Sequence, residues 1–452
     1  MSSLTSKTIR ASFWVIFGFG AAQIIRLGGN LILTRLLAPE LFGVMAIVWV
    51  VLNGAVMLSD FGLVPAVVRS KISSPSRFHD TVWTLKVIRG WFLFFCINIF
   101  AVFIYYEQSI GLVGENSVYA FQELPLILLS ISFIPLIESY GTLAIAIQTK
   151  NLEHKKLELI ELFSQLLGMT LMITLAYIYS TIWALVVGSI LTTTIYLFLT
   201  YRLFSIRHNL LIDKQHISEI YHFGKWVFIA SSLTFFAQQG DKLYFSSIIT
   251  PTELGIYSIA FMIISVFRTV LDTFATKVWY PYFCNKIETE SSLKETYYNV
   301  KIFNQISVFI VALILYKIGQ PLIDFLYDER YSSAGTMIRI LVISLMAISI
   351  TSVTRVCLTA LGETKVQVQS MLVRSSILVV TLPLSFYHFG LLGAILAYAL
   401  NVYFMIPVQL IRIYRVNLIS YKHEALSILI NIVFMVTLYF LEPKFWLAIV
   451  NS

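Results

Sequence analysis

Charged residues are scarce in this sequence. Asp, Glu, Lys and Arg together make up 12% of its 452 residues, whereas ordinary soluble domains carry about 25%. Hydrophobic residues account for 58%, and they gather in runs long enough to cross a bilayer. A chain of this length and composition cannot form a water-soluble globule. The sequence therefore predicts an integral membrane protein.

The sequence also lacks the motifs of soluble enzymes. It has no G-x-x-x-x-G-K-[ST] loop for ATP, and no HExxH motif or Cys/His cluster for zinc. Its three cysteines, Cys96, Cys284 and Cys357, lie far apart, which is typical of core residues and not of disulfides or metal sites. The longest loop runs only from about residue 204 to residue 223. We therefore predict no enzyme, no cofactor and no metal.

Hydropathy predicts thirteen membrane-spanning helices. Each is an apolar run of helix length, and none shows the roughly ten-residue alternation of a β-barrel strand. The predicted class is therefore an all-α membrane protein. The predicted spans cover residues 11–36, 42–68, 84–106, 121–148, 157–179, 181–203, 224–249, 254–280, 300–318, 336–361, 366–387, 390–411 and 425–441.

The first quarter of the chain resembles a segment 212 positions later. The matched pairs are Trp14 and Trp226, Gly28 and Gly240, Pro39 and Pro251, Gly43 and Gly255, and Asp60 and Asp272. They fall at equivalent points of two apolar segments and the turn between them. Self-similarity of this kind indicates two copies of one unit, which in membrane proteins is typical of transporters.

The repeat predicts the domain organisation. Twelve of the thirteen spans form two sets of six, and the thirteenth is an addition at the C-terminal end. The predicted units are residues 1–210 and residues 211–420, followed by an additional membrane segment and tail at 421–452.

The positions of Lys and Arg predict the orientation. With a cytoplasmic N-terminus, most basic residues lie in or beside inner loops, including Arg89, Lys301 and Arg374, as the positive-inside rule requires. The net charge of +8 is therefore a signal of topology. Because the charges are spread over many loops, they do not form a nucleic-acid surface.

The histidines offer no catalytic set. Seven are present, mostly in loops on the predicted cytoplasmic side. Exposed histidine is common at such places, so we interpret them as solvated residues of the interface.

Ionisable residues inside the predicted spans are the candidates for function. A charge at membrane depth costs about 2.5–3.5 kcal/mol on insertion scales, so it usually faces a cavity, a partner or water. We predict that three basic residues line a cavity for an anionic group: Arg26, Lys242 and Arg268. Four acidic residues are predicted to serve gating or ion coupling: Asp60, Asp241, Asp272 and Glu138.

A structural interpretation of the same charges stays open. Arg268 and Asp272 are four residues apart and could form an intrahelical pair. Arg26 could pair with Asp60 across the first hairpin. Asp60 could also cap a helix break beside Gly62. Such contacts would fix the packing of helices without binding a substrate.

Several segments resemble the polysaccharide-transport flippases of the multidrug/oligosaccharidyl-lipid/polysaccharide exporter superfamily. RLLAPELFG at 35–43 and LSDFGL at 58–63 are similar to the first outer turn and the second-helix signature of that family. GDKL at 240–243 and TPTELGIY at 250–257 are similar to its seventh-helix motif and the turn that follows. YDERY at 327–331 falls where the family has a comparable element.

The resemblance implies a fold and an activity. The fold would be two pseudo-symmetric six-helix bundles in a V, with one extra C-terminal helix. The activity would be that of a Wzx-type flippase, which moves an undecaprenyl-pyrophosphate-linked repeat unit across the bacterial cytoplasmic membrane by alternating access coupled to an ion gradient. The product would serve O-antigen, capsule or exopolysaccharide synthesis. The implied protein is monomeric and works with polysaccharide polymerase and chain-length machinery.

Three alternatives share parts of this pattern. An ion-coupled multidrug exporter of the same superfamily would favour cations, whereas the opening helices here carry three bases. A membrane polysaccharide polymerase or glycosyltransferase would expose a large outer catalytic loop, which this sequence lacks. A lipid II flippase of the cell wall would share the fold, but the turn motifs resemble the polysaccharide branch.

Overall fold

All thirteen predicted spans fall on helices. The computed structural model describes residues 2–451 apart from 71–74, 115, 152, 154, 205 and 289–292, and this part contains helices and no strand. The predicted all-α class is therefore confirmed. The grouping into two six-helix bundles in a V stays a prediction.

The chain divides into two units. Unit 1 comprises Met1–Phe235 and Phe245–Gly255, and unit 2 comprises Phe236–Tyr244 and Ile256–Ser452. The repeat boundaries at residues 210 and 420, which rest on the sequence pattern alone, stay predictions.

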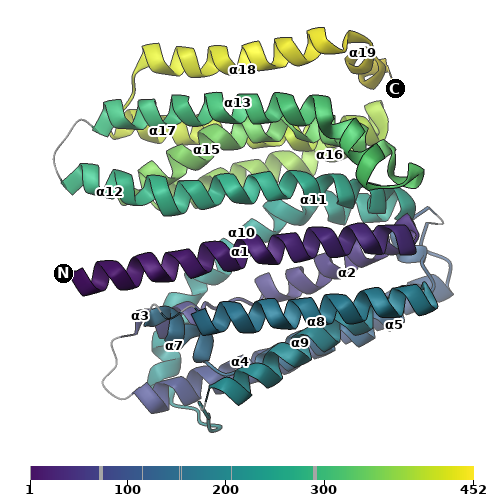
Figure 1. Ribbon diagram of the computed structural model, residues 1–452, viewed down its shortest axis with the longest axis vertical. Coiled ribbons are helices and arrows are strands. Elements are labelled where there is room, and N and C mark those ends of the chain that lie inside the picture. Colours follow the sequence, from purple (N-terminus) through teal and green to yellow (C-terminus); the bar gives the residue numbers. More distant parts are fainter. Residues whose placement is uncertain are drawn as a thin grey trace. The chain divides into compact units, whose positions relative to one another are not determined.

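Unit 1 is built from long helices with shorter pieces between them (Figure 1). In chain order they are α1 (Ser2–Leu36), α2 (Pro39–Met57), α3 (Leu63–Arg69), α4 (Pro75–Ser109), α5 (Leu124–Ile131), α6 (Phe133–Ser139), α7 (Ala144–Lys150), α8 (Lys155–Tyr179), α9 (Trp183–Leu203) and most of α10 (Lys214–Ile248).

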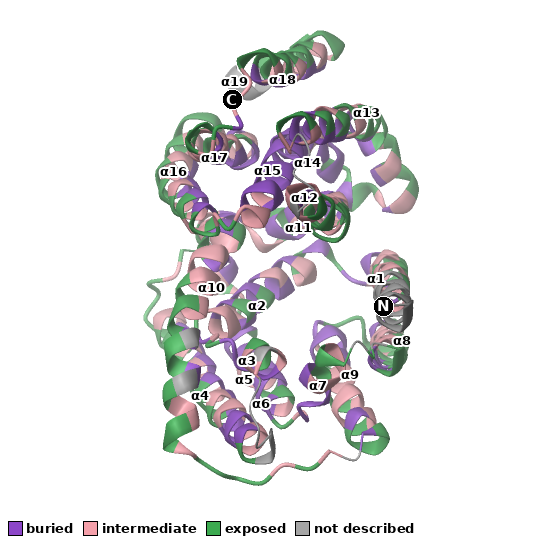
Figure 2. Ribbon diagram, turned by 90° about the vertical axis from the view of Figure 1, so that its left-hand side faces the viewer, coloured by how far each residue is buried: buried purple, intermediate pink, exposed green. Residues whose placement is uncertain are grey.

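Unit 2 is also built from long helices and shorter helical pieces, and one of its helices is buried. Its helices are α11 (Pro251–Phe274), a π-helical segment (Ala275–Trp279), α12 (Tyr280–Glu288), α13 (Leu293–Leu326), α14 (Ser333–Leu341), α15 (Ile343–Ala360), α16 (Lys365–Asn401), α17 (Met405–Arg415), α18 (Tyr421–Leu441) and α19 (Pro443–Asn451). Figure 2 shows α15 buried along most of its length. Helices α12, α13, α14, α16 and α17 pack against it.

Helix α16 contains the predicted span 366–387 and the first half of the span 390–411, which continues into α17. Its backbone leaves helical geometry at Phe389 and at Gly390, where φ is +57°, a region that glycine enters without steric cost. A straight helix would separate Arg374 from Asn401 by about 40 Å, yet Arg374 Nε donates to Asn401 Oδ1 at 3.3 Å. The chain therefore reverses at Gly390, between the predicted spans 366–387 and 390–411.

Nine helical segments within the described ranges are apolar and long enough to cross a membrane, when the run from Lys365 to Arg415 is counted once. The bent pair Leu124–Ser139 and Ala144–Lys150 would make a tenth. Helix α10 is not among them, because it carries charged residues such as Asp241 and Lys242. Helix α1 is not among them either.

The two matched turns of the repeat pack against each other within unit 1. A Cβ atom added to Gly43 would lie 1.8 Å from the carbonyl oxygen of Pro251, and one added to Gly255 would lie 2.0 Å from that of Pro39. The second turn is also closed by a capping box, in which Thr250 and Glu253 exchange hydrogen bonds through their side chains and backbone. The repeated glycines therefore permit a reciprocal contact between backbones.

We expect Gly43→Ala to destabilise the protein and Gly28→Ala to leave it unchanged or slightly more stable. A methyl group at Gly43 must push apart two backbones, and overpacking of this kind costs about 1–3 kcal/mol. Gly28 belongs to the same repeat, but a Cβ there meets nothing within 4 Å. Thermal unfolding of the two purified variants in detergent tests this. Equal melting temperatures would contradict the steric role of Gly43.

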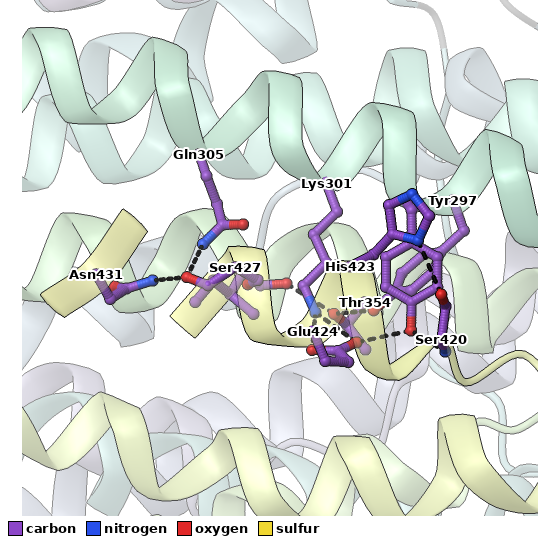
Figure 3. Close-up of polar contacts among 11 residues, drawn as sticks. Tyr297, Lys301, Gln305, Thr354, Ser420, His423, Glu424, Ser427 and Asn431 are labelled. Atoms are coloured by element: carbon purple, nitrogen blue, oxygen red, sulfur yellow. Dashed lines mark hydrogen bonds and ion pairs between the residues drawn. The ribbon is translucent and has the colours of Figure 1, made fainter. Parts of the chain in front are cut away.

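The thirteenth predicted span, α18, is fastened to unit 2 by buried polar contacts (Figure 3). Lys301 of α13 donates to Glu424 Oε1 and Oε2 at 2.8 and 2.7 Å. Both residues are buried, at 0% and 8% exposure. Tyr298 donates to the same carboxylate at 2.9 Å. The helix is therefore an integral part of unit 2 and not a loose addition.

Further contacts extend this attachment along α18. Gln305 Nε2 donates to the carbonyl oxygen of Ser427 at 3.2 Å. At the far end of the helix, Arg339 of α14 pairs with Glu442 at 2.7 Å. Because hydrogen bonds and ion pairs take the place of the hydrophobic effect between helices in lipid, these contacts hold α18 in one register.

Candidate functional site

Two of the predicted basic residues meet in unit 2 around the ring of Phe261. Lys242 Nζ of α10 lies 4.4 Å from the ring centroid, and Arg268 Cζ of α11 lies 5.9 Å from it. Phe261 and Arg268 are seven residues apart, so they share one face of α11. A cation over an aromatic face is stabilised by the ring quadrupole. The ring of Phe261 therefore brings the two basic side chains to one place.

A third cation, Arg374 of α16, completes this cationic cluster. Its Cζ lies 5.8 Å from the ring of Tyr398, whose hydroxyl accepts a hydrogen bond from Arg268 Nη1 at 3.2 Å. The reversal at Gly390 allows one helix to supply both Arg374 and Tyr398. The sequence counted Arg374 among the inner flanks and not among the site residues, whereas its side chain is buried, at 3% exposure.

Arg374 is held in place without being neutralised. Its Nε donates to Asn401 Oδ1 at 3.3 Å, and Asn401 Nδ2 donates to the Arg374 carbonyl oxygen at 3.2 Å. Its buried Nη2 has no hydrogen-bond partner among the residues that the structure describes. A buried guanidinium donor without an acceptor is costly, so this atom is a candidate donor to a bound anion.

Asp241 supplies a carboxylate beside these cations. It is fully buried, and it accepts a hydrogen bond from the Tyr257 hydroxyl at 2.5 Å. Its charge acts on both Lys242 and Arg374. Asp272 also acts on Arg268, but it forms an ion pair with Arg355. Three basic side chains therefore face Asp241 as the one carboxylate that is not paired with a further base among the described residues.

The remaining predicted base, Arg26, lies in a different cavity, lined entirely by unit 1. This cavity has a volume of about 390 Å³. Its lining residues come from α1, α6, α8 and α9: Arg26, Glu138, Glu161, Ser164, Gln165, Thr192, Thr193 and Tyr196. The structure thus brings two predicted residues, Arg26 and Glu138, to one site. We call it the unit 1 cavity.

Glu138 also faces two bases of α4 that were counted as flanking residues. Lys86 and Arg89 both act electrostatically on Glu138, and Lys86 Nζ donates to the carbonyl oxygen of Gly141 at 3.0 Å. Arg89 in turn donates to the Val56 carbonyl oxygen at 2.5 Å. These contacts place α4 firmly beside the cavity wall.

Asp60 caps a helix break, as one interpretation of the sequence expected. It lies between α2 and α3, where its Oδ1 accepts a hydrogen bond from the Gly62 N–H at 2.9 Å and its Oδ2 accepts one from Ser231 at 3.2 Å. Arg89 of α4 interacts electrostatically with Asp60. The alternative pairing of Asp60 with Arg26 is not found among the ion pairs of the described residues.

Asp272 pairs with Arg355, not with Arg268. Arg355 Nη2 of α15 donates to Asp272 Oδ1 at 2.9 Å, immediately before the π-helical segment Ala275–Trp279. The intrahelical Arg268–Asp272 pair was a wrong alternative, because Arg268 turns to Tyr398 instead. The repeat-related Asp60 and Asp272 therefore both stand at irregular points of the backbone but have different partners.

One histidine departs from the solvated interfacial set predicted for these residues. His208, in the segment before α10, stacks on Trp83 with ring centroids 5.8 Å apart, and its side chain is only 3% exposed. Its Nε2 accepts a hydrogen bond from the Leu143 N–H at 3.1 Å. Burial lowers the pKa of His208 below its usual value, although Asp80 opposes the shift.

This environment predicts a pH-dependent stability. Only the neutral ring of His208 can accept the hydrogen bond from Leu143. As the pH falls below about 6.5, the ordinary pKa of histidine, His208 is therefore protonated more readily in the unfolded chain than in the folded chain. We expect the melting temperature to fall as the pH drops below about 6.5. His208→Gln keeps an acceptor that does not titrate and should flatten this fall. An unchanged pH profile in the variant would contradict the role of His208.

No group of three or more metal-binding side chains occurs in the part of the chain that the structure describes.

The sequence of this chain is similar to those of known proteins. Residues 32–336 match the family model of the polysaccharide biosynthesis proteins, which is more than half of the chain. The chain belongs to this family. A relative in Escherichia coli K12, the lipopolysaccharide biosynthesis protein WzxC, is 23% identical over 350 residues, which cover 75% of this chain and 67% of the relative. About a third of that relative thus lies outside the match.

Solved structures support the fold. The lipid II flippase MurJ in an inward closed conformation is similar with a TM-score of 0.65 at 14% identity, covering 95% of this chain and 99% of MurJ. An inward-facing multidrug resistance MATE transporter of the MOP superfamily has a TM-score of 0.63 at 14% identity, covering 87% of this chain and 94% of the transporter. At such low identity these likenesses show the fold and not the cargo.

The predicted family is thereby confirmed. The chain is a member of the polysaccharide biosynthesis protein family, it has the fold of MurJ and the MATE transporter, and its described part holds apolar helices enough for a multi-pass membrane protein. The cytoplasmic N-terminus, the monomeric state and the polymerase and chain-length partners stay predictions, as do the roles of the site residues.

Proposed function

We propose that this protein flips an undecaprenyl-pyrophosphate-linked oligosaccharide from the inner to the outer leaflet for O-antigen, capsule or exopolysaccharide synthesis. The observation that carries the proposal is the cationic cluster of unit 2 in a member of this family. Lys242, Arg268 and Arg374 exceed Asp241 in charge, and the free Nη2 of Arg374 offers a donor to a phosphate oxygen. Planar guanidinium groups suit phosphate because they can donate to two oxygens at once.

The acidic residues take different parts in this proposal. Asp241, buried beside the cations, is the candidate for ion coupling, because its charge state would change the net charge of the phosphate site. Asp272 with Arg355, and Asp60 beside Arg89, are candidate gates, because each holds an irregular backbone segment through a contact that can open. Glu138 belongs to the unit 1 cavity and is not needed for the phosphate site.

A multidrug exporter is the second candidate, because the MATE transporter has the same fold. Its cations would have to enter a site with three bases and one carboxylate, and like charges disfavour that. The excess of positive charge therefore supports the phosphate-linked cargo.

The deciding experiment compares lipid-linked oligosaccharides in cells with and without this protein, with the leaflet determined by an external label that cannot cross the membrane. Cells without it should accumulate a complete repeat unit on the cytoplasmic leaflet and lose surface polysaccharide. A normal pool with intact polysaccharide would reject the proposed cargo. Uptake of organic cations would then test the drug-exporter alternative.

A further inference from the structure

The unit 1 cavity differs in chemistry from the cationic cluster. Its lining has one guanidinium, Arg26, against two carboxylates, Glu138 and Glu161. The other lining side chains are uncharged. Four carry hydroxyls and one carries an amide: Ser164, Thr192, Thr193, Tyr196 and Gln165. Lys86 and Arg89 of α4 act on Glu138 but are not lining residues, so a pyrophosphate placed here would contact two carboxylates and one guanidinium, and the carboxylates disfavour it. The cavity is therefore built for a polar ligand without strong negative charge.

The helix packing around the cavity fixes the positions of these groups. A Cβ added to Gly168 of α8 would lie 1.7 Å from Thr192 Oγ1 of α9, so the two helices are in close contact. Gln165 Nε2 donates to the Ala22 carbonyl oxygen of α1 at 3.4 Å. Glycine contacts and interhelical hydrogen bonds of this kind hold membrane helices in one arrangement.

The hydroxyls on α9 already have partners for their protons. Thr192 donates to the Gly188 carbonyl oxygen at 2.7 Å, and Thr193 donates to that of Ser189 at 3.2 Å. Their oxygens keep lone pairs that can still accept a hydrogen bond. With the carboxylates of Glu138 and Glu161, the cavity therefore offers many acceptors, and Arg26 supplies charged donors.

We propose that the unit 1 cavity binds an uncharged, hydroxyl-rich sugar residue of the cargo, an inference that rests on the proposed function. Each sugar hydroxyl both donates and accepts, so it can donate to a carboxylate while it accepts from Arg26. The volume of about 390 Å³ lies within the range of small-molecule sites, about 300–1,000 Å³. The phosphate and the sugar are thus recognised by chemically distinct sites on different units.

The test measures thermal protection of the full-length protein in detergent by free sugars. D-galactose, D-mannose and N-acetyl-D-glucosamine are each added at tens of millimolar, and inorganic pyrophosphate is added separately. The cavity variants are Glu161→Gln and Thr193→Val. The matched control is Thr194→Val, because Thr194 is the next residue of α9, is exposed, is absent from the cavity lining and makes the same kind of bond, to the Ile190 carbonyl oxygen. Lys242→Met serves as the control in unit 2.

We expect at least one sugar to raise the melting temperature of the wild-type protein, of Thr194→Val and of Lys242→Met. In Glu161→Gln and Thr193→Val its apparent dissociation constant should rise about tenfold, as the loss of one or two hydrogen bonds predicts. Protection of Glu161→Gln by pyrophosphate would show that this variant is folded.

Two results would overturn the inference. One is that none of the sugars protects the wild-type protein, or that their protection survives in both cavity variants. The other is that pyrophosphate protection is lost in Glu161→Gln and kept in Lys242→Met, which would make the cavity the phosphate site. The two proposals can be separated by combining both assays. If sugar protection of the purified protein is lost in the cavity variants, but cells without the protein do not accumulate the lipid-linked oligosaccharide, the sugar site is supported and the proposed cargo is rejected.

Discussion

We expect the substitution Lys301→Met to lower the free energy of unfolding more than any other single substitution proposed for unit 2. It leaves Glu424 buried without its cation, and breaking a buried ion pair by removal of one partner costs about 3–5 kcal/mol. Lys301 is 0% exposed and donates to both oxygens of Glu424, so no water replaces the lost contact easily. Chemical denaturation of the purified variant in detergent should show the loss, together with a lower yield of folded protein.

Two controls make this result specific. Lys317→Met lies on the same helix at an exposed position, so it should change stability by less than about 0.5 kcal/mol. The double variant Lys301→Met with Glu424→Met removes both charges and should recover most of the loss, because an apolar pair of similar volume is often neutral. A double variant no more stable than the single variant would reject the ion pair as the cause.

The attachment of α18 could not be predicted from the sequence. The predicted spans 300–318 and 425–441 began within one residue of Lys301 and Glu424, so both residues looked like charges at the membrane edge. Only the packing of α13 against α18 shows that they are buried together. Hydropathy assigns a helix to the membrane, but it does not say which partner a charge at the end of the helix will meet.

Most of the helices were predictable, because most of the predicted spans are apolar runs of sufficient length. The paired turns were also predictable as turns, since Pro39 and Pro251 begin helices in both halves. Their mutual contact through Gly43 and Gly255 was not. A repeat indicates equivalent positions in two copies, whereas the packing of one copy against the other depends on three-dimensional geometry.

The candidate site was predicted in part. The cost of intramembrane charge led to Arg26, Lys242 and Arg268, and the structure places the last two together around Phe261. It places Arg26 with two glutamates in the unit 1 cavity instead. Arg374 was missed, although it lies inside the predicted span 366–387 and should have been treated like Arg26. Tyr398 gave no signal, because an aromatic residue in a membrane helix is unremarkable in sequence.

The variant Arg374→Met should abolish most export of surface polysaccharide. Methionine fills much of the space, but it removes the buried guanidinium that we assign to the phosphate. Loss of one partner of a buried charged contact costs about 2–5 kcal/mol, so the export rate should fall roughly 30-fold or more if binding of the headgroup limits it. The measurement is surface polysaccharide per molecule of membrane-inserted protein, in cells that lack the native copy.

The controls separate the charge from its geometry and from stability. Arg415→Met removes an exposed arginine at the end of α17 and should export normally. Arg374→Lys keeps the charge but loses the planar fork and the bond from Nε to Asn401, so it should export at an intermediate rate. Inorganic pyrophosphate should protect the wild-type protein and Arg415→Met against heat, but not Arg374→Met. Full export by a folded Arg374→Met protein would show that the Arg374 guanidinium does not bind the phosphate.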